Sequence, residues 1–422
     1  MATSNTAPKK PSLLVISNVL PYPGTAGQQQ RVRYKLEALR ERFEITFLTV
    51  SAPDQVPDIK SRLEEMGVSI LVLPSRYERG IISKFFYRAS GSIYCLWTGL
   101  KFSNYIIGEV EYTPARVVDL TAGKKFDGVI YEYWHAHRSA SVFRERATPS
   151  VLDMHDVLWR AYQQQLDSRP YLPGFWKRRS LEKYRRREEA AWGEFDGIIA
   201  INSEELEYVS TKAPSGVRLF HTPMGTDLKS WRYSWQPAAP PRLVYYGGLG
   251  SQRNQHSALV CHSKVMPLIW EAFPDAELWL VGSNPPGEFH SLARSDRRVK
   301  VTGFVEHVQE VLNTMTLALC PWTGTFGFRS RLVELMALGV PVVASPQAVS
   351  GMEMDEGKGI FLRESPGEMA ETALNLLADR EYSRTQSRYA REQVERKFSF
   401  EATYGKLSVI LYTWLSRHGN YP

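Results

Sequence analysis

Short apolar runs alternate with longer stretches of helical period along most of the chain. A first series of runs lies at Leu13–Ser17, Ile45–Val50, Ser69–Leu73, Gly128–Tyr133, Ser150–His155 and Gly197–Asn202. A second series lies at Leu243–Gly247, Glu277–Gly282, Val299–Gly303, Leu317–Pro321, Pro341–Ser345 and Gly359–Leu362. Strands that alternate with helices are typical of parallel sheets with helices on both faces. The pattern therefore predicts an α/β protein with two Rossmann-like, doubly wound sheets.

Between the two series lies a segment without any period, residues 230–242, which reads SWRYSWQPAAPPR and contains three prolines. This composition marks a connection rather than an element. We therefore expect a first domain at residues 1–230 and a second at residues 231–399. The amphipathic segment that follows predicts a helix at residues 400–418 that crosses back to the first domain.

The first helix is expected to follow a glycine-containing loop with Gly24 and Gly27. Val32, Leu36 and Leu39 stand at positions i, i+4 and i+7, which is the spacing of one helix face. The chain therefore opens with a strand, a glycine loop and a helix whose buried stripe is formed by these three residues.

A second helix is expected at residues 176–192, WKRRSLEKYRRREEAAW, because apolar residues share one face and Arg and Lys occupy the rest. Glu188 falls on the apolar side. A carboxylate is rarely buried without a partner, so we expect a basic neighbour to hold Glu188. The alternative is a basic ridge that faces a membrane.

The composition of the 422 residues is that of a globular protein, with 43% hydrophobic and 23% charged residues. The three cysteines, Cys95, Cys261 and Cys320, lie far apart and form neither a metal motif nor a disulfide framework, which favours a reducing, cytoplasmic location. No run approaches the roughly 20 apolar residues that cross a bilayer. The formal charge of +7 favours anionic partners, but no nucleic-acid-binding module accompanies it, so we expect no nucleic-acid partner.

The stretch that carries most chemical information is residues 323–345, TGTFGFRSRLVELMALGVPVVAS. A glycine-containing loop leads into a helix, and such a loop offers backbone N–H groups and the positive end of the helix dipole to an anion. Arg329 and Arg331 lie at the start of this helix, where planar guanidinium groups can bind phosphate oxygens. Glu334, one turn further on, can accept hydrogen bonds from vicinal hydroxyls such as those of ribose. The spacing indicates a site for a nucleoside diphosphate.

This stretch resembles the signature of the retaining glycosyltransferases of group 1, also called family 4. In that signature a basic residue precedes a glutamate by three positions and Gly-x-Pro-Val-Val follows; here Arg331, Glu334 and the sequence from Gly339 to Val343 match it. The resemblance implies a GT-B fold, in which two Rossmann-like domains face a cleft. It also implies transfer of a sugar from a UDP-, GDP- or ADP-sugar to a hydroxyl acceptor, with no cofactor and no essential metal.

Further segments are similar to the same family. The turn VYYGGLG with Gly247 and Gly248, followed by Arg253, resembles its glycine-rich turn with a basic residue that faces the donor phosphates. The segment VTGFVEHVQEVLN resembles the segment that holds the nucleotide base through backbone groups, here at Gly303, Phe304 and Val305. The resemblance therefore implies that all of these residues bind the donor, and that Arg253 and Arg331 stabilise charge on its leaving diphosphate.

In the first domain, the opening strand and the glycine loop with Gly27 resemble the family's segment near donor and acceptor, and LDMHDV resembles its strand that ends in His-Asp. The resemblance implies that His155 contacts the donor sugar or steadies the leaving group. Three positions depart from the family pattern. Phe326 stands where many members have an earlier glutamate, Met224 replaces the usual asparagine of a Pro-Asn-Gly turn, and Gly248 stands where many members have arginine. The alternatives are a nucleotide-sugar-binding scaffold without turnover and a sugar-nucleotide epimerase of similar architecture.

His135 and His137 stand two positions apart at an expected strand end, which invites comparison with a metal site. No third ligand stands at a recognisable spacing. We therefore expect a structural role or a sugar contact for these histidines and no metal site.

The acceptor is least defined by the sequence. Residues 75–105 mix basic with aromatic side chains, namely Arg76, Arg79, Lys84, Arg88 and Lys101 with Phe85, Phe86, Tyr87, Tyr94, Trp97 and Phe102. Such a segment suits peripheral contact with an anionic membrane that carries a lipid-linked acceptor. The alternative is a helical pair that lines a groove for a sugar or another small acceptor.

Overall fold

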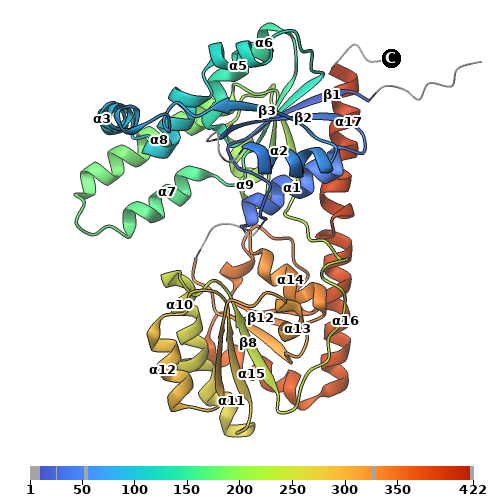
Figure 1. Ribbon diagram of the computed structural model, residues 1–422. Helices are drawn as coiled ribbons and strands as arrows, with labels where there is room; N and C mark the ends of the chain where they lie inside the picture. The colour runs from blue at the N-terminus through green and yellow to red at the C-terminus, as the bar shows by residue number, and fades with distance from the viewer. Residues whose placement is uncertain (1–9, 25, 52–55, 325–327, 419–422) are drawn as a thin grey trace, which may run out of the picture. The chain divides into compact units, whose positions relative to one another are not determined.

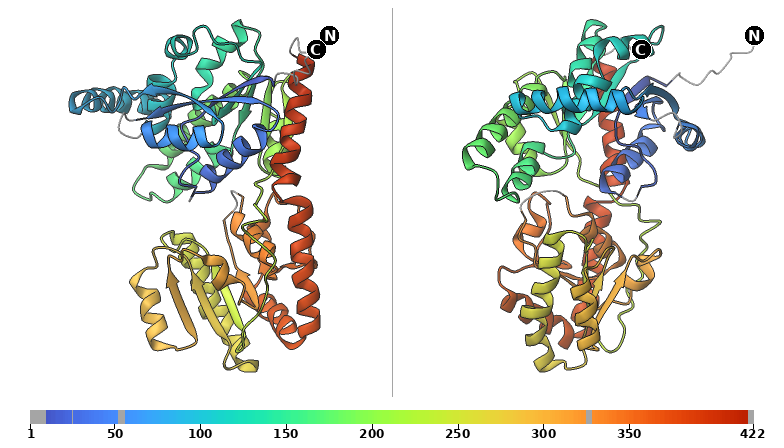
Figure 2. Two further views of the ribbon diagram at one scale, coloured as in Figure 1. Left: turned by 45° about the vertical axis from the view of Figure 1, so that its right-hand side comes forward. Right: turned by 60° about the vertical axis from the view of Figure 1, so that its left-hand side comes forward.

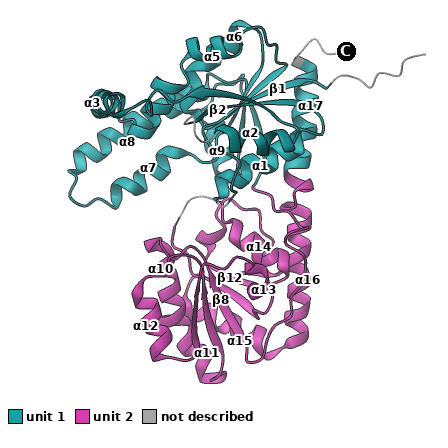
Figure 3. Ribbon diagram, in the orientation of Figure 1, with its two compact units in different colours: residues 1–223, 404–422 teal, residues 224–403 magenta. Residues whose placement is uncertain are grey.

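The computed structural model describes residues 10–24, 26–51, 56–324 and 328–418. The chain forms two compact units, residues 1–223 with 404–422 and residues 224–403 (Figure 3). The sequence places the boundaries at 230/231 and 399/400, close to these limits. The connecting segment around residues 230–242 belongs to the second unit, where Trp235 donates from its indole nitrogen to the carbonyl of Met315 at 2.9 Å.

Unit 1 is built on a seven-stranded parallel sheet in the order β3-β2-β1-β4-β5-β6-β7 (Figure 1). Its strands are β1 Ser12–Ile16, β2 Glu44–Ser51, β3 Ser69–Pro74, β4 Gly128–Glu132, β5 Ser150–Asp153, β6 Gly197–Ala200 and β7 Arg218–His221. Its helices are α1 Gly27–Leu39, α2 Val56–Glu65, α3 Ile81–Thr98, α4 Phe102–Tyr105, α5 Pro114–Leu120, α6 Ala140–Glu145, α7 Leu158–Asp167, α8 Gly174–Trp192, α9 Ser203–Ser210 and α17 Lys406–His418, with a π-helical stretch η2 Ile106–Glu111 and a 3-10 helix η3 Trp134–Ser139.

Unit 2 is built on a six-stranded parallel sheet in the order β10-β9-β8-β11-β12-β13. Its strands are β8 Arg242–Tyr246, β9 Glu277–Val281, β10 Val299–Gly303, β11 Leu317–Cys320, β12 Val342–Ala344 and β13 Ile360–Leu362. Its helical segments are α10 Gln252–Val260, η4 Cys261–Val265, α11 Met266–Ala272, α12 Gly287–Ser295, α13 Val308–Leu312, α14 Ser330–Leu338, η5 Pro346–Val349, α15 Pro366–Ala378, α16 Arg380–Lys397 and η6 Glu401–Gly405, the last of which spans the boundary with unit 1. Helices lie on both faces of each sheet, as Figure 1 and the two views of Figure 2 show.

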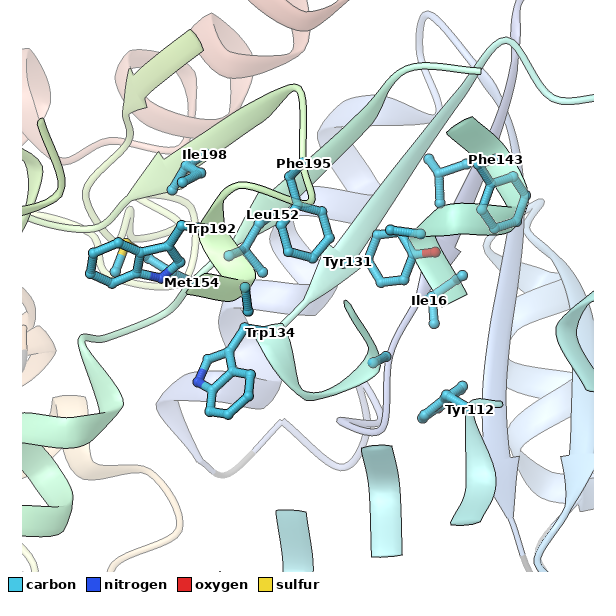
Figure 4. Packing of buried hydrophobic residues seen from close by; sticks show 14 of the residues in the cluster. Ile16, Tyr112, Tyr131, Trp134, Phe143, Leu152, Met154, Trp192, Phe195 and Ile198 are labelled. Carbon is cyan, nitrogen blue, oxygen red and sulfur yellow. The ribbon is translucent and has the colours of Figure 1, made fainter. Parts of the chain in front are cut away.

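Alternate residues of the central strands supply the two faces of each sheet. In β1, Leu14 and Ile16 pack in one core with Tyr131 and Trp192, whereas Leu13 and Val15 pack in the other. Figure 4 shows the first of these cores, with large aromatic side chains packed beside the strands. Because both faces are buried, the strands read as continuous apolar runs, and each run predicted as a strand forms one.

The C-terminal helix returns to unit 1, as the sequence predicts. Leu407, Leu411 and Leu415 of α17 are buried in the same core as Leu13 and Val15 of β1. Their spacing of four residues places them on one helix face. Strand β1 and helix α17, the first and last described elements, therefore share one core.

The predicted stripe on α1 is also confirmed, since Val32, Leu36 and Leu39 are fully buried. The predicted basic partner of Glu188 is wrong. Glu188 on α8 is fully buried, but its two carboxylate oxygens accept hydrogen bonds from the backbone N–H groups of Leu158 and Trp159 at 2.8 and 2.7 Å. These amides open α7, so the carboxylate caps a helix N-terminus in place of pairing with a cation.

Candidate functional site

In unit 2, Arg331 and the glycine turn after β8 lie side by side. The Arg331 guanidinium carbon is 5.1 Å from the ring centroid of Tyr246, the last residue of β8. A Cβ placed on Gly248 would stand 3.6 Å from the nearer guanidinium nitrogen. The basic residue predicted to bind phosphate thus lies beside the loop predicted to approach the same phosphate.

Glu334 lies one turn further along α14 and is almost fully buried. Burial raises the pKa of its carboxyl, against the opposing effects of the Arg331 charge and a hydrogen bond from the Tyr246 hydroxyl. Arg331, Glu334 and Tyr246 therefore form one polar cluster. Tyr246 did not stand out in the sequence, although its position just before Gly247 and Gly248 at a strand end was a usable signal.

The two turns that follow β8 and β9 touch through their backbones. A Cβ on Gly282 would lie 1.8 Å from the carbonyl oxygen of Gly247, and the φ of Gly282 is +154°. Two hydrogen bonds join the turns: Gly247 N–H to the Val281 carbonyl at 3.0 Å, and Leu249 N–H to the Ser283 carbonyl at 2.8 Å. Glycine is needed at position 282 because any side chain would push the turn carrying Gly247 aside.

Arg329 and Arg253 lie differently from Arg331. Arg329 is the residue that precedes α14. Its guanidinium carbon lies 3.7 Å from the centroid of the Trp322 ring. Arg253 is exposed in the first turn of α10 and makes no ion pair with any residue that the structure describes. The departure at Phe326 lies outside the described residues.

The segment predicted to hold the nucleotide base lies at the end of edge strand β10. Gly303 closes this strand with a φ of +70°, Phe304 is 78% exposed, and Val305 is half-buried. The carboxyl ends of β8, β10 and β11 share one edge of the parallel sheet, which is where ligands of open α/β sheets bind. The fold thus places this segment at the same edge of the sheet as Arg331.

In unit 1, His155 stands two residues beyond β5, in a loop rather than in the predicted strand. Its backbone has a φ of +60°, and its ring stacks on Tyr133 with centroids 4.2 Å apart and planes 15° apart. Its Nε2 lies 2.6 Å from a carboxylate oxygen of Glu132, the last residue of β4. Tyr133 donates its hydroxyl to the Gln28 side chain at 3.0 Å, next to Gly27, the first residue of α1.

Two cations that the sequence did not single out complete this site. Arg31 on α1 makes hydrogen bonds of 3.0–3.1 Å to both carboxylate oxygens of Asp153, and Lys35 contacts both Asp153 and Glu132, the latter at 2.6 Å. All four side chains are buried. Burial alone would raise the pKa of Asp153, but the charges of Arg31 and Lys35 prevail and hold it well below its usual range. Arg31 and Lys35 lie one turn apart on a helix that follows a glycine loop, and this spacing could have indicated that both cations face the same site.

Donor atoms of Glu132, Asp153 and His155 lie within 4.8 Å of one another, close enough to surround a metal ion. The same carboxylate oxygens already contact Lys35 and Arg31. A divalent cation here would face two buried positive charges. We therefore assign these carboxylates to ion pairing.

His135 and His137 lie in the 3-10 helix η3 rather than at a strand end. Nε2 of His135 lies 3.3 Å from the hydroxyl of buried Tyr184. Burial, followed by the charge of Lys101, lowers the pKa of His135 to about 3, and burial lowers the pKa of His137 to about 4. Neither histidine belongs to a metal-sized cluster in the described part of the chain.

A family model described as "Glycosyl transferases group 1" matches residues 240–379, which span most of unit 2. Residues 240–379 thus form a group 1 glycosyltransferase domain. The predicted resemblance to group 1 is confirmed for these residues, which include the cluster of Tyr246, Arg331 and Glu334. No curated protein matches this sequence.

Solved structures with the same fold include several glycosyltransferases. Sucrose-phosphate synthase from Thermosynechococcus elongatus shares 18% identity over 97% of this chain and 100% of its own, with a TM-score of 0.66. HepE from Anabaena, in complex with UDP and glucose, shares 16% identity over 95% of this chain and 99% of its own, with a TM-score of 0.61. TarM shares 11% identity over 97% and 99%, with a TM-score of 0.61. These matches confirm the predicted GT-B class of the fold.

Proposed function

We propose that this glycosyltransferase moves a sugar, with retention of configuration, from a UDP-, GDP- or ADP-sugar to a hydroxyl acceptor in the synthesis of a polysaccharide, glycolipid or glycoconjugate. The cluster of Arg331, Glu334 and Tyr246 carries this proposal. It combines a guanidinium group beside a glycine turn, suited to phosphate, with a buried carboxylate suited to ribose hydroxyls. The complex of HepE with UDP and glucose is consistent with a UDP-sugar donor.

The reaction needs the leaving diphosphate to be stabilised as the glycosidic bond breaks. Arg331, Arg253 and Arg329 would supply positive charge, and the backbone N–H groups at Gly247 and Gly248 would supply hydrogen bonds. We propose that no metal ion or cofactor is required. The leaving phosphate itself would take the proton of the incoming hydroxyl, and His155 would hold a hydroxyl of the donor sugar.

Thermal unfolding in the presence of UDP, GDP and ADP, and of their sugars, tests the donor site. A ligand that binds the folded state raises the unfolding midpoint. We expect one nucleotide series to raise it, and Arg331→Ala and Glu334→Ala each to abolish the rise. Arg294→Ala, at an exposed position of α12 in the same unit, is the matched control and should keep the rise. A full rise in both site variants would show that the site is misplaced.

Turnover separates the enzyme from the alternatives. Incubation with the stabilising donor should release the nucleotide diphosphate, by transfer when an acceptor is present or by slow hydrolysis. Tight binding without release would indicate a nucleotide-sugar-binding scaffold, and a sugar-nucleotide product of changed configuration would indicate an epimerase.

We further propose that the enzyme works in the cytoplasm at the inner face of an anionic membrane, on a lipid-linked acceptor. No helix of the described chain is long and apolar enough to span a membrane. Helix α3, however, exposes a continuous apolar stripe in which Ile82 is 86%, Phe86 65% and Trp97 74% exposed. Exposed apolar patches of this kind mark protein or membrane contacts, and a helix with basic neighbours suits an anionic interface.

The opposite face of α3 explains why this stripe points outward. A Cβ on Gly91 would lie 2.6 Å from the Phe102 ring and 2.9 Å from the Tyr105 ring, so α3 packs closely on α4 at this point. That contact fixes which face is buried. Figure 1 shows α3 at the edge of unit 1, beside α8 and away from the sheet.

Sedimentation with vesicles tests the membrane contact. A variant with Ile82, Phe86 and Trp97 replaced by Ser should lose most of its binding to vesicles of phosphatidylcholine and phosphatidylglycerol at low salt. A control with the exposed Val118, Val409 and Tyr412 of α5 and α17 replaced by Ser should bind as the wild type does. Equal binding of all three proteins, or no binding by the wild type, would contradict the proposal.

A further inference from the structure

A cavity of about 840 Å³ lies within unit 1, between α3, α4, α7 and α8. Neither the donor cluster of unit 2 nor the His155 cluster contributes to its walls. Its lining combines three cations with aromatic and aliphatic side chains. A volume of this size admits a ligand of several polar atoms.

The three cations are Arg88 on α3, Lys101 just before α4, and Arg169 after α7. None of them makes an ion pair within the described chain. Arg88 donates to the Tyr77 hydroxyl at 3.0 Å, and the Lys101 ammonium lies 5.0 Å from the Tyr162 ring centroid. Positive groups that converge on one cavity without carboxylate partners favour an anionic ligand.

Lys101 is the least solvated of the three. Burial lowers the pKa of its ammonium group, and the charge of Arg169 lowers it further. The charge of Glu188 raises this pKa in turn, but the Glu188 oxygens already accept hydrogen bonds from the amides of Leu158 and Trp159. A bound anion would offset the repulsion between Lys101 and Arg169.

The cavity is continuous with the exposed stripe of α3. Leu96, which is 63% exposed, belongs both to the apolar side of α3 and to the cavity lining. Phe102 and Trp176 add aromatic walls. An occupant that satisfies both surfaces has an anionic head and an apolar tail.

We propose that this cavity binds the phosphate headgroup of an anionic lipid, with the hydrocarbon tail leaving along Leu96 and the stripe of α3. The inference rests on the membrane contact proposed above and assigns it a specific pocket. Arg88 and Arg169 would form charge-assisted hydrogen bonds to phosphate oxygens, and Lys101 would add a third from the floor of the cavity. The lipid is either the acceptor itself or a lipid that anchors the enzyme beside it.

Binding to vesicles of phosphatidylcholine with phosphatidic acid tests the pocket. The pocket variant is R88Q/K101Q/R169Q, and the matched control is R79Q/R178Q/R179Q, which removes the same charge from exposed arginines near α3 and on α8. If binding depended only on the overall positive charge of the surface, both variants would lose the same amount of vesicle affinity. Since the pocket variant also loses charge-assisted hydrogen bonds, we expect its affinity to fall at least roughly tenfold further than that of the control. Equal losses would overturn the proposal.

Soluble glycerol 3-phosphate distinguishes a lipid from a free phosphate compound. At phosphate concentrations at which phosphatidic acid vesicles saturate the wild type, we expect glycerol 3-phosphate to raise its unfolding midpoint weakly or not at all. If glycerol 3-phosphate raised the midpoint as much as the vesicles do, and the pocket variant abolished that rise, the cavity would bind a soluble ligand and the lipid part of the proposal would be overturned.

The nucleotide-induced rise in the unfolding midpoint should be the same in the pocket variant and the wild type, because the donor cluster lies in the other unit. Loss of lipid binding with an intact nucleotide response thus tests the pocket alone. An unchanged unfolding midpoint without ligand shows that the three substitutions leave the fold intact.

Discussion

The imidazole Nε2 of His155 lies 2.6 Å from one carboxylate oxygen of Glu132, and the ammonium group of Lys35 lies 2.6 Å from the other. A carboxylate paired with an ammonium group is ionised and can only accept hydrogen bonds. His155 therefore carries a proton on Nε2. In the neutral ring this leaves Nδ1 as an acceptor.

Glu132→Gln should weaken catalysis without weakening nucleotide binding. The amide keeps the shape of the side chain but loses the charge that fixes the His155 proton on Nε2. We expect kcat to fall by roughly tenfold, the equivalent of about one hydrogen bond. The nucleotide-induced rise in the unfolding midpoint should stay unchanged. Glu37→Gln on α1, which removes a half-exposed partner of Arg33, should keep full turnover; full turnover in Glu132→Gln would refute the role of Glu132.

Asp153→Ala should strongly destabilise unit 1. The substitution leaves Arg31 without its carboxylate partner and Lys35 with Glu132 alone, all of them buried. Removing one partner of a buried ion pair costs about 3–5 kcal/mol, whereas Asp58→Ala, which breaks the exposed pair with Arg62, should cost under about 1 kcal/mol. Urea unfolding measures both values, and similar small losses would show that the buried cluster contributes little to stability.

The fold could be predicted from the sequence because both faces of each sheet are buried. Each central strand is then a continuous apolar run, and the helices between the runs fix the parallel topology. Edge strand β7 was not predicted, because only Phe220 among its four residues is buried. A short, half-exposed strand leaves almost no apolar signal.

The candidate site could be predicted where its residues are close in sequence. Arg331 and Glu334 lie within one helical turn, so their shared face followed from spacing alone. The pair of Arg31 and Asp153 is separated by 122 positions and is formed only by the packing of α1 on β5. Residues brought together by tertiary packing leave no local pattern, which is why Arg31, Lys35 and Glu132 were missed.

Gly282→Ala should disturb both the stability and the donor site of unit 2. Its Cβ would meet the Gly247 carbonyl oxygen at 1.8 Å, and its φ of +154° is strained for alanine. We expect a loss of about 2–4 kcal/mol in the free energy of unfolding and weaker nucleotide binding, because the turn with Gly247 and Gly248 must move. Gly287→Ala, where a Cβ meets nothing within 4 Å, should stay within about 1 kcal/mol of the wild type.

Glu188 should make the stability of unit 1 depend on pH. Burial raises the pKa of its carboxyl to about 8, although the hydrogen bonds from Leu158 and Trp159 act in the opposite direction. The unfolded chain releases this proton near pH 4.3. Between these values the folded state holds one proton more than the unfolded state, so stability falls as pH rises, by at most about 1.4 kcal/mol per pH unit. Above about pH 8 both states are ionised and the effect levels off.

Unfolding of the wild type and of Glu188→Gln, measured from pH 5 to pH 9, tests this prediction. Glutamine cannot ionise, so the variant should gain stability relative to the wild type as pH rises towards 8. Glu205, whose pKa burial also raises to about 8, should leave a residual slope that Glu188→Gln/Glu205→Gln removes. Glu207→Gln, at an exposed position on α9, is the control and should follow the wild type. Parallel curves for the wild type and Glu188→Gln would mean that Glu188 is already ionised in the folded protein at pH 5, held so by the two amides of α7.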